Sequence, residues 1–208
     1  MNKTYEAIKR YYQWPNIKKK VEYVKKCAKC QLNKTLKPKG KAAMEITTTA
    51  RHPFEKCALD IIGPMTETMS GNKYILTFQD DLIKFIVAIP IPQQDAGTIA
   101  KEFVLNVGVP AQILTNQGSY FLSDLFKNTC KLLKIKKIQT TAFHPESNGG
   151  LEKGHRVLAE YLRHCVREDQ TNWDEWIPYA VYVYNTMVRT TTAHTPFELV
   201  YGFRSEVP

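Results

Sequence analysis

Three polar residues lie in apolar surroundings at spacings that suit metal-dependent chemistry. Asp60 interrupts the run Ala-Leu-Asp-Ile-Ile, Asn116 follows Ile-Leu-Thr, and Glu152 follows Gly-Gly-Leu. Acids at all three positions would form a two-metal phosphoryl-transfer site, where one ion activates the attacking oxygen and the other stabilises the leaving oxygen. The middle position here is an amide, so the sequence indicates what the site descends from more firmly than what it still does.

Each of these residues also has an ordinary structural interpretation. Asp60 could reach solvent at a strand end, Asn116 could be a turn residue, and Glu152 could complement the dipole of a helix start. Together, however, two strand ends and a helix start can converge on one crevice, because α/β sheets place ligands at the carboxyl ends of their strands. Carboxylate oxygens there would favour Mg²⁺ or Mn²⁺ over Zn²⁺.

The elements that must position these residues follow from hydrophobic periodicity. Short apolar runs bounded by turn residues predict strands at 55–62, 73–79, 85–91, 111–115 and 135–141. Wider apolar spacing predicts helices at 100–107, at 119–133, from about 148 onward and at 173–188. Three consecutive strands followed by alternating helices and strands predict an α/β domain with a mixed five-stranded sheet and helices packed against it.

Charge divides the chain into a basic arm and a near-neutral body. Of the 29 Lys/Arg and 20 Asp/Glu residues, residues 1–41 hold 13 basic and 2 acidic, and the rest holds 16 and 18. This layout is typical of a protein that binds a polyanion such as nucleic acid, although a solubilising tail would look similar. Lys18, Lys19 and Lys20 are candidate phosphate contacts. A second group, Lys131, Lys134, Lys136 and Lys137, could bind DNA or simply protect a sheet edge.

Composition excludes several classes of protein. The hydrophobic fraction of 43% is enough for a packed core. No run approaches the roughly 20 apolar residues of a membrane span, and the first residues lack the apolar core of a signal peptide, so we expect a nuclear or cytoplasmic protein without a membrane partner. The five cysteines are odd in number and mostly far apart, which argues against a disulfide framework.

The chain is predicted to have three parts: a small helical arm over 1–35, a basic linker over 36–53 and the α/β body over 54–208. Cys27 and Cys30 have the spacing of half a zinc site. Every histidine lies downstream of them, starting at His52, and structural zinc requires four ligands. We therefore do not expect this chain to hold structural Zn²⁺, because its arm corresponds to a truncated zinc-binding module.

Six segments together resemble one family. They are RYYQWP (10–15), CAKCQLNK (27–34), LDIIGP (59–64), LTNQGS (114–119), HPESNG (144–149) and TPFELVYG (195–202). In this order and spacing, covering nearly the whole chain, they resemble the integrase of gypsy-type LTR retrotransposons and retroviruses, a part of the Pol polyprotein. The resemblance implies an RNase H-like core with helices on both sheet faces, preceded by a truncated His-His-Cys-Cys zinc-binding domain.

The resemblance also implies a function. Integrases process the ends of element DNA and join them to a target, using Mg²⁺ or Mn²⁺, and act as homo-oligomers on double-stranded DNA. Asp60 and Glu152 match the first and third acids of the family, and Asn116 stands where the family has its second Asp. The resemblance therefore assigns these three positions to catalysis and the two acids to metal binding.

Residues near Glu152 are implied to contact DNA. In the family, basic residues on this helix meet the DNA end, a role that would fall to Lys153 and Arg156. His144 and Asn148, in the segment rich in helix breakers before the helix, would also contact DNA. That segment could be a mobile loop over the site or a plain loop and helix start.

The amide at position 116 leads to two hypotheses. Asn offers a neutral carbonyl oxygen in place of a charged carboxylate, so two divalent ions would lose one unit of ligand charge. The first hypothesis is an integrase core with weak or absent strand transfer. The second is a non-catalytic module that binds DNA or supports assembly while keeping the fold. An unrelated RNase H-like nuclease is a remote third reading.

Overall fold

The computed structural model describes residues 50–139 and 149–205, and residues 5, 8, 9, 11–21 and 26–28 of the arm. The predicted mixed five-stranded sheet is confirmed. Its strands, in the order β3-β2-β1-β4-β5, are β1 Lys56–Ile62, β2 Tyr74–Asp80, β3 Ile86–Ile91, β4 Gln112–Thr115 and β5 Lys136–Gln139. β1 pairs antiparallel with β2 and parallel with β4, while β2–β3 is antiparallel and β4–β5 is parallel.

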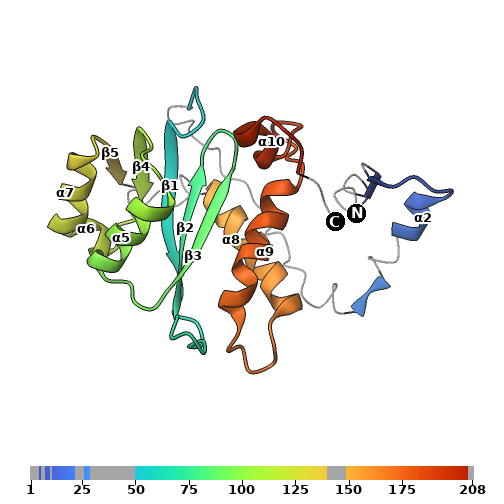
Figure 1. The fold of residues 1–208 in the computed structure, drawn as a ribbon, viewed down its shortest axis with the longest axis horizontal. Helices are drawn as coiled ribbons and strands as arrows, with labels where there is room; N and C mark the ends of the chain where they lie inside the picture. The colour runs from blue at the N-terminus through green and yellow to red at the C-terminus, as the bar shows by residue number, and fades with distance from the viewer. Residues whose placement is uncertain are drawn as a thin grey trace, which may run out of the picture.

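Helices cover both faces of this sheet (Figure 1). One face carries α5 Ala96–Asn106, α6 Ser119–Leu122 and α7 Asp124–Leu132, and the other carries α8 Gly149–Cys165 and α9 Trp173–Thr186. The short helix α10 Pro196–Tyr201 follows α9, and α2 Ile17–Val21 lies in the arm. None of the helices in the described part of the chain has the length and apolar content that a membrane span requires.

The alternation of side chains along β1 decides which face Asp60 occupies. Cys57 and Leu59 are fully buried in the core beneath α5–α7. Ile62 packs instead against the cluster that contains Trp173 of α9. Because successive strand residues point to opposite faces, Asp60 lies on the same face as Ile62, which is the face covered by α8 and α9.

Three apolar clusters hold these layers together. The larger one packs strands β1, β2 and β4 against α5–α7 through residues that include Leu59, Phe78, Phe103, Ile113, Phe121 and Phe126. The smaller ones, under α8 and α9, contain Ile75, Ile86, Leu158, Leu162, Trp173 and Ile177. Burial of this apolar area on both faces is the main force that fixes the sheet between its helices.

One local prediction is wrong, and one helix was not predicted. The single helix predicted over 119–133 is wrong, because Ser123 has an extended ψ of 149° and separates α6 from α7. Its hydroxyl accepts the N–H of Phe126 and caps α7, an alternative to continued helix that serine readily provides. The sequence reading also missed α10, which begins with a capping box between Thr195 and Glu198 and ends at Gly202 with φ 77°.

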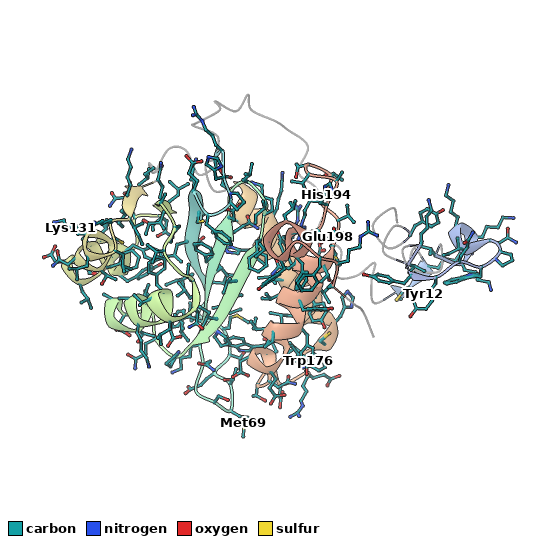
Figure 2. The ribbon with its side chains drawn as sticks, turned by 45° about the horizontal axis from the view of Figure 1, so that its top comes forward. Tyr12, Met69, Lys131, Trp176, His194 and Glu198 are labelled. Carbon is teal, nitrogen blue, oxygen red and sulfur yellow. The ribbon has the colours of Figure 1, made fainter. Side chains whose placement is uncertain are left out.

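The second lysine group lies at a sheet edge, as one of its two interpretations requires. Figure 2 shows Lys131 on the side of the molecule opposite Trp176 and Glu198. Lys131, Lys134 and Lys136 are exposed, and β5 is an edge strand. Burial lowers the pKa of the neighbouring Lys137, whose Nζ is buried and has no hydrogen-bond partner among the described residues.

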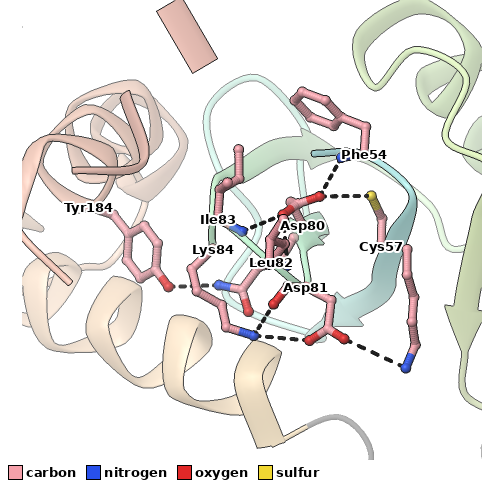
Figure 3. Close-up of polar contacts among 10 residues, drawn as sticks. Phe54, Cys57, Asp80, Asp81, Leu82, Ile83, Lys84 and Tyr184 are labelled. Carbon is pink, nitrogen blue, oxygen red and sulfur yellow. Dashed lines mark hydrogen bonds and ion pairs between the residues drawn. The ribbon is translucent and has the colours of Figure 1, made fainter. Parts of the chain in front are cut away.

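A buried carboxylate fastens the start of the core to the β2–β3 turn (Figure 3). Asp80 is fully buried and accepts backbone N–H groups from Phe54 at 2.6 Å, Leu82 at 2.8 Å and Ile83 at 2.6 Å. The thiol of Cys57 lies 3.8 Å from the same carboxylate. Burial raises the pKa of Asp80 despite these donors. The carboxylate thus satisfies three backbone donors at once, in the manner of a helix cap.

Replacing Asp80 with alanine should therefore lower the free energy of unfolding by about 2–4 kcal/mol, because buried N–H donors would be left without acceptors. Chemical denaturation followed by tryptophan fluorescence measures the change. The matched control is Asp124→Ala, since the Asp124 side chain is 93% exposed and its Oδ1 forms a surface ion pair of 3.5 Å with Lys127 Nζ, which contributes little to stability. Equal effects of the two substitutions would contradict the structural role of Asp80.

Candidate active site

Parallel pairing of β1 and β4 brings two of the three positions together. Leu59 pairs with Thr115 in this register, so Asp60 and Asn116 follow at the same level of the sheet. The Asn116 Nδ2 donates a hydrogen bond of 2.8 Å to Asp60 Oδ1. The backbone N–H of Ile61 donates to the same oxygen, also at 2.8 Å. Two donors thus converge on one oxygen of the Asp60 carboxylate.

The Asn116 amide is fixed in one orientation by hydrogen bonds at both of its ends. Its Oδ1 accepts the backbone N–H of Gly118 at 2.9 Å, while its nitrogen faces Asp60. The Asn116 side chain also hydrogen-bonds the hydroxyl of Tyr120. An amide has donors on one end and acceptors on the other, so this network suits Asn and places an N–H, rather than an oxygen, toward Asp60.

Tyr120 is a site residue that the sequence reading missed. Its ring folds back over Gly118, where an added Cβ would lie 2.5 Å from Tyr120 Cζ and 2.8 Å from the hydroxyl oxygen. Glycine at 118 is therefore required by this placement of the ring. Burial raises the pKa of Tyr120, and the charge of Asp60 adds to the shift. The only signal in the sequence was its position four residues after Asn116.

The helix that carries Glu152 crosses the sheet beside Asp60. Glu152 lies in α8, but its side chain is outside the described residues. Gly154 is buried two residues later, and a Cβ there would lie 3.0 Å from Gln79 Nε2 and 3.2 Å from Ile86 Cδ1. The next residue, His155, lies 2.7 Å from Thr77 Oγ1 through its Nε2. The backbone of α8 thus runs over β2, the strand adjacent to Asp60.

The donor set at 60 and 116 only partly fits a divalent ion. Asp60 supplies the hard oxygen that Mg²⁺ or Mn²⁺ prefers. Asn116 presents a hydrogen-bond donor to the same space, and a donor repels a cation. Among the described side chains, no three His, Cys, Asp or Glu residues are grouped as a metal site. An ion shared by positions 60 and 116 would require an oxygen to replace the Asn116 N–H.

The remaining candidate residues are more scattered. Lys153 is exposed and Arg156 is half-buried on α8, and Lys18, Lys19 and Lys20 are exposed on α2. The Nζ of Lys18 lies 5.3 Å from the ring centroid of Tyr5. His144, Asn148 and Cys30 lie outside the described residues, and Cys27 is half-buried. The DNA contacts of His144 and Asn148 and the incomplete zinc site at Cys27 and Cys30 therefore stay predictions.

Comparison with known proteins supports a common origin with Pol polyproteins. A family model for an integrase zinc-binding domain matches residues 1–36. The Pol polyprotein of transposon 412 from Drosophila melanogaster is 40% identical over 213 residues, which cover 100% of this chain and 17% of that protein. The Pro-Pol polyprotein of simian foamy virus type 3 is 26% identical over 99% of this chain and 18% of its own length. The chain thus spans less than a fifth of these relatives.

Solved structures establish the fold. The integrase catalytic core of HTLV-2, solved in complex with magnesium in a trimeric form, superposes with a TM-score of 0.57 over 73% of this chain and 99% of that core, at 17% identity. The BIV integrase catalytic core gives 0.55 over 70% of this chain and 93% of that core, at 21% identity. The expected fold, a mixed five-stranded sheet with helices on both faces as in these catalytic cores, is confirmed.

The buried histidine beside the site gives a pH-dependent prediction. Burial lowers the pKa of His155 to about 4, whereas the ring titrates near 6.5 in the unfolded chain. The unfolded state therefore binds more protons between these values, so this contribution to stability is present above pH 6.5 and is lost as the pH falls toward 4.

Urea titrations from pH 4 to 7.5 should show that the free energy of unfolding depends less steeply on pH in His155→Gln than in the unaltered protein. His164→Gln, at a half-buried position further along α8, serves as the control, and equal slopes for all three proteins would contradict the prediction.

Proposed function

Because this chain is a relative of retroelement Pol polyproteins with an integrase-type core, we propose that it is an integrase core that binds DNA but joins it weakly or not at all. The observation that carries the proposal is the hydrogen bond from Asn116 to Asp60. An N–H stands where a metal-binding carboxylate is needed, while the fold around it is complete. The polypeptide therefore keeps the scaffold of a DNA-joining enzyme and has lost one of its acids.

Asp60 and Glu152 are the two acids that remain for this reaction. In a two-metal phosphoryl transferase, the ions polarise the scissile phosphate and activate the attacking oxygen. Asp60 lies on the α8 face of the sheet, and α8 carries residue 152, so the two positions share one side of the core. Asn116 removes one negative charge from this set and aims a donor at Asp60. Binding of Mg²⁺ or Mn²⁺ should therefore be weak in the chain as it stands.

DNA binding rests on basic residues in two regions. Lys153 and Arg156 follow position 152 on α8, where a DNA end approaching the site would meet them. Lys18, Lys19 and Lys20 are exposed on α2, within the region matched by the zinc-binding family. We assign residues 1–35 to a zinc-binding-type arm, 36–53 to a linker and 54–208 to the core. By analogy with the trimeric HTLV-2 core, self-association is part of the proposal, as is action in the nucleus or cytoplasm.

A non-catalytic role in DNA binding or assembly is the second candidate. The observation that favours it is the complete set of partners around the Asn116 amide, from Asp60, Gly118 and Tyr120. If Asn116 were only a random loss of the acid, its side chain would not need hydrogen-bond partners for both the amide nitrogen and the amide oxygen. In this second candidate function, the chain keeps its fold and its surface charge but catalyses no reaction.

Restoring the acid separates the two candidates. Asn116→Asp should produce strand transfer with pre-cut donor DNA and Mg²⁺ or Mn²⁺ at a level at least about 100-fold above the unaltered chain, because removing one catalytic group of this kind commonly costs 10²–10³ in rate. Asn128→Asp, an exposed residue of α7 that adds the same charge, is the matched control and should have no effect. Strong joining by the unaltered chain would overturn the claim of impairment, and an inactive Asn116→Asp that still binds DNA would favour the second candidate.

Salt dependence tests the DNA contacts. Affinity for duplex DNA should fall linearly with the logarithm of salt concentration, by a slope of about 0.9 per phosphate contacted. Replacing Lys18, Lys19 and Lys20 together with alanine should reduce that slope by about 2–3, as measured by fluorescence anisotropy across a salt series. Lys101→Ala is the control, because this lysine is 71% exposed on α5, on the opposite face of the sheet from α8. An unchanged slope in the triple variant would remove α2 from the DNA-binding surface.

A further inference from the structure

Two hydrogen bonds in series connect α8 to Asp60, the first of the two acids, through the side chain of Thr77 on β2. Thr77 is the antiparallel partner of Asp60 on β2 and is fully buried. Its hydroxyl donates to the backbone carbonyl of Asp60 at 3.0 Å and lies 2.7 Å from His155 Nε2. A hydroxyl has one proton, and this one is donated to the carbonyl. The bond from His155 must therefore come from an N–H at Nε2, which defines the tautomer of the neutral ring.

His155 makes this connection close to position 152 on α8. It lies three residues after Glu152, and residues three apart lie on the same face of a helix. The preceding residue is Gly154, whose missing side chain lets α8 approach Gln79 and Ile86 closely. The helix is thus held to β2 within one turn of position 152, at the level of the sheet where Asp60 lies.

Apolar packing alone does not fix the position of α8 along its own axis. Leu151, Leu158 and Leu162 bury the helix against the sheet, but such contacts are non-directional and tolerate small shifts along the helix axis. The hydrogen bonds through Thr77 are directional, and they end on Asp60 itself. They are therefore suited to fix where this turn of α8 lies relative to Asp60, and so the distance between positions 60 and 152.

We propose that Thr77 and His155 are positioning residues that set the separation of Asp60 from residue 152, and so the affinity of the site for a divalent cation once an acid occupies position 116. The proposal rests on the proposed function, because it assumes that these acids share an ion. Partners that orient metal ligands from outside the coordination sphere commonly contribute 10–100-fold to metal affinity.

The test uses the full chain carrying Asn116→Asp and measures Mn²⁺ affinity by calorimetry and by the Mn²⁺-dependent rise in Tm. Adding Thr77→Val, which keeps the shape of the side chain but removes the hydroxyl, should weaken Mn²⁺ binding at least about tenfold. Thr77→Ser keeps the hydroxyl and should bind within about twofold of the parent. His155→Leu should behave like Thr77→Val, and His155→Gln, which keeps an N–H donor, should retain most of the affinity.

Thr68→Val is the matched control for loss of a buried threonine hydroxyl. Thr68 is 4% exposed, and its hydroxyl donates to Asp174 at the start of α9 instead of tying β1 to α8. This variant should lower Tm without changing Mn²⁺ affinity. If Thr77→Val and His155→Leu both bind Mn²⁺ as tightly as the parent, the positioning role is overturned.

A second measurement decides the proposal without metal. In the otherwise unaltered chain, Thr77→Val should speed hydrogen exchange of the α8 amides near residues 153–156 and leave those near 162–165 unchanged. Thr77→Ser and Thr68→Val should leave both regions unchanged. Failure of Asn116→Asp to bind Mn²⁺ would count against the proposed function, and the exchange result would still decide the role of Thr77. Unchanged exchange at 153–156 would overturn that role.

Discussion

The hydrogen bond between Asn116 and Asp60 is the interaction on which the interpretation of this protein depends. It joins the ends of two parallel strands, and it does so with an N–H donor in the space where an ion would need an oxygen. The same bond that completes the local packing therefore opposes metal binding. Gly118 adds to this effect, because its N–H donates to Oδ1 of Asn116 and so leaves the amide nitrogen facing Asp60.

The rest of the fold supplies the platform for that bond. Alternation along β1 sends Leu59 into the core under α5–α7 and leaves Asp60 on the opposite face, where α8 passes. Polar groups on that face are matched in pairs: Thr77 with His155, and Gln79 with Tyr184 at 2.7 Å. The interface with α5–α7 is thus mainly apolar apart from buried polar groups such as Asp80, whereas directional bonds define how the helix lies at the other interface. The candidate site belongs to the second interface.

Much of the architecture could be predicted from the sequence, because strands with long apolar runs and helices with regular spacing produce strong signals. All five strands were predicted near their observed positions, and the mixed sheet followed from their order. The break at Ser123 could not be predicted, since a serine in a helical pattern caps or continues a helix according to its surroundings. The proximity of residues 60 and 116 depends on register between strands more than fifty residues apart, and Tyr120 enters the site only because its ring folds back. Neither relation is encoded in local periodicity.

The placement of the Tyr120 ring over Gly118 has a consequence for how this protein can change over evolutionary time. With the ring where it is, every side chain larger than hydrogen at 118 would collide with it. A small residue at 120 would remove that barrier but would also take away a partner of the Asn116 amide. Substitutions at 118 and 120 are therefore epistatic: a side chain at 118 is compatible with the fold only after the ring at 120 has been replaced or displaced.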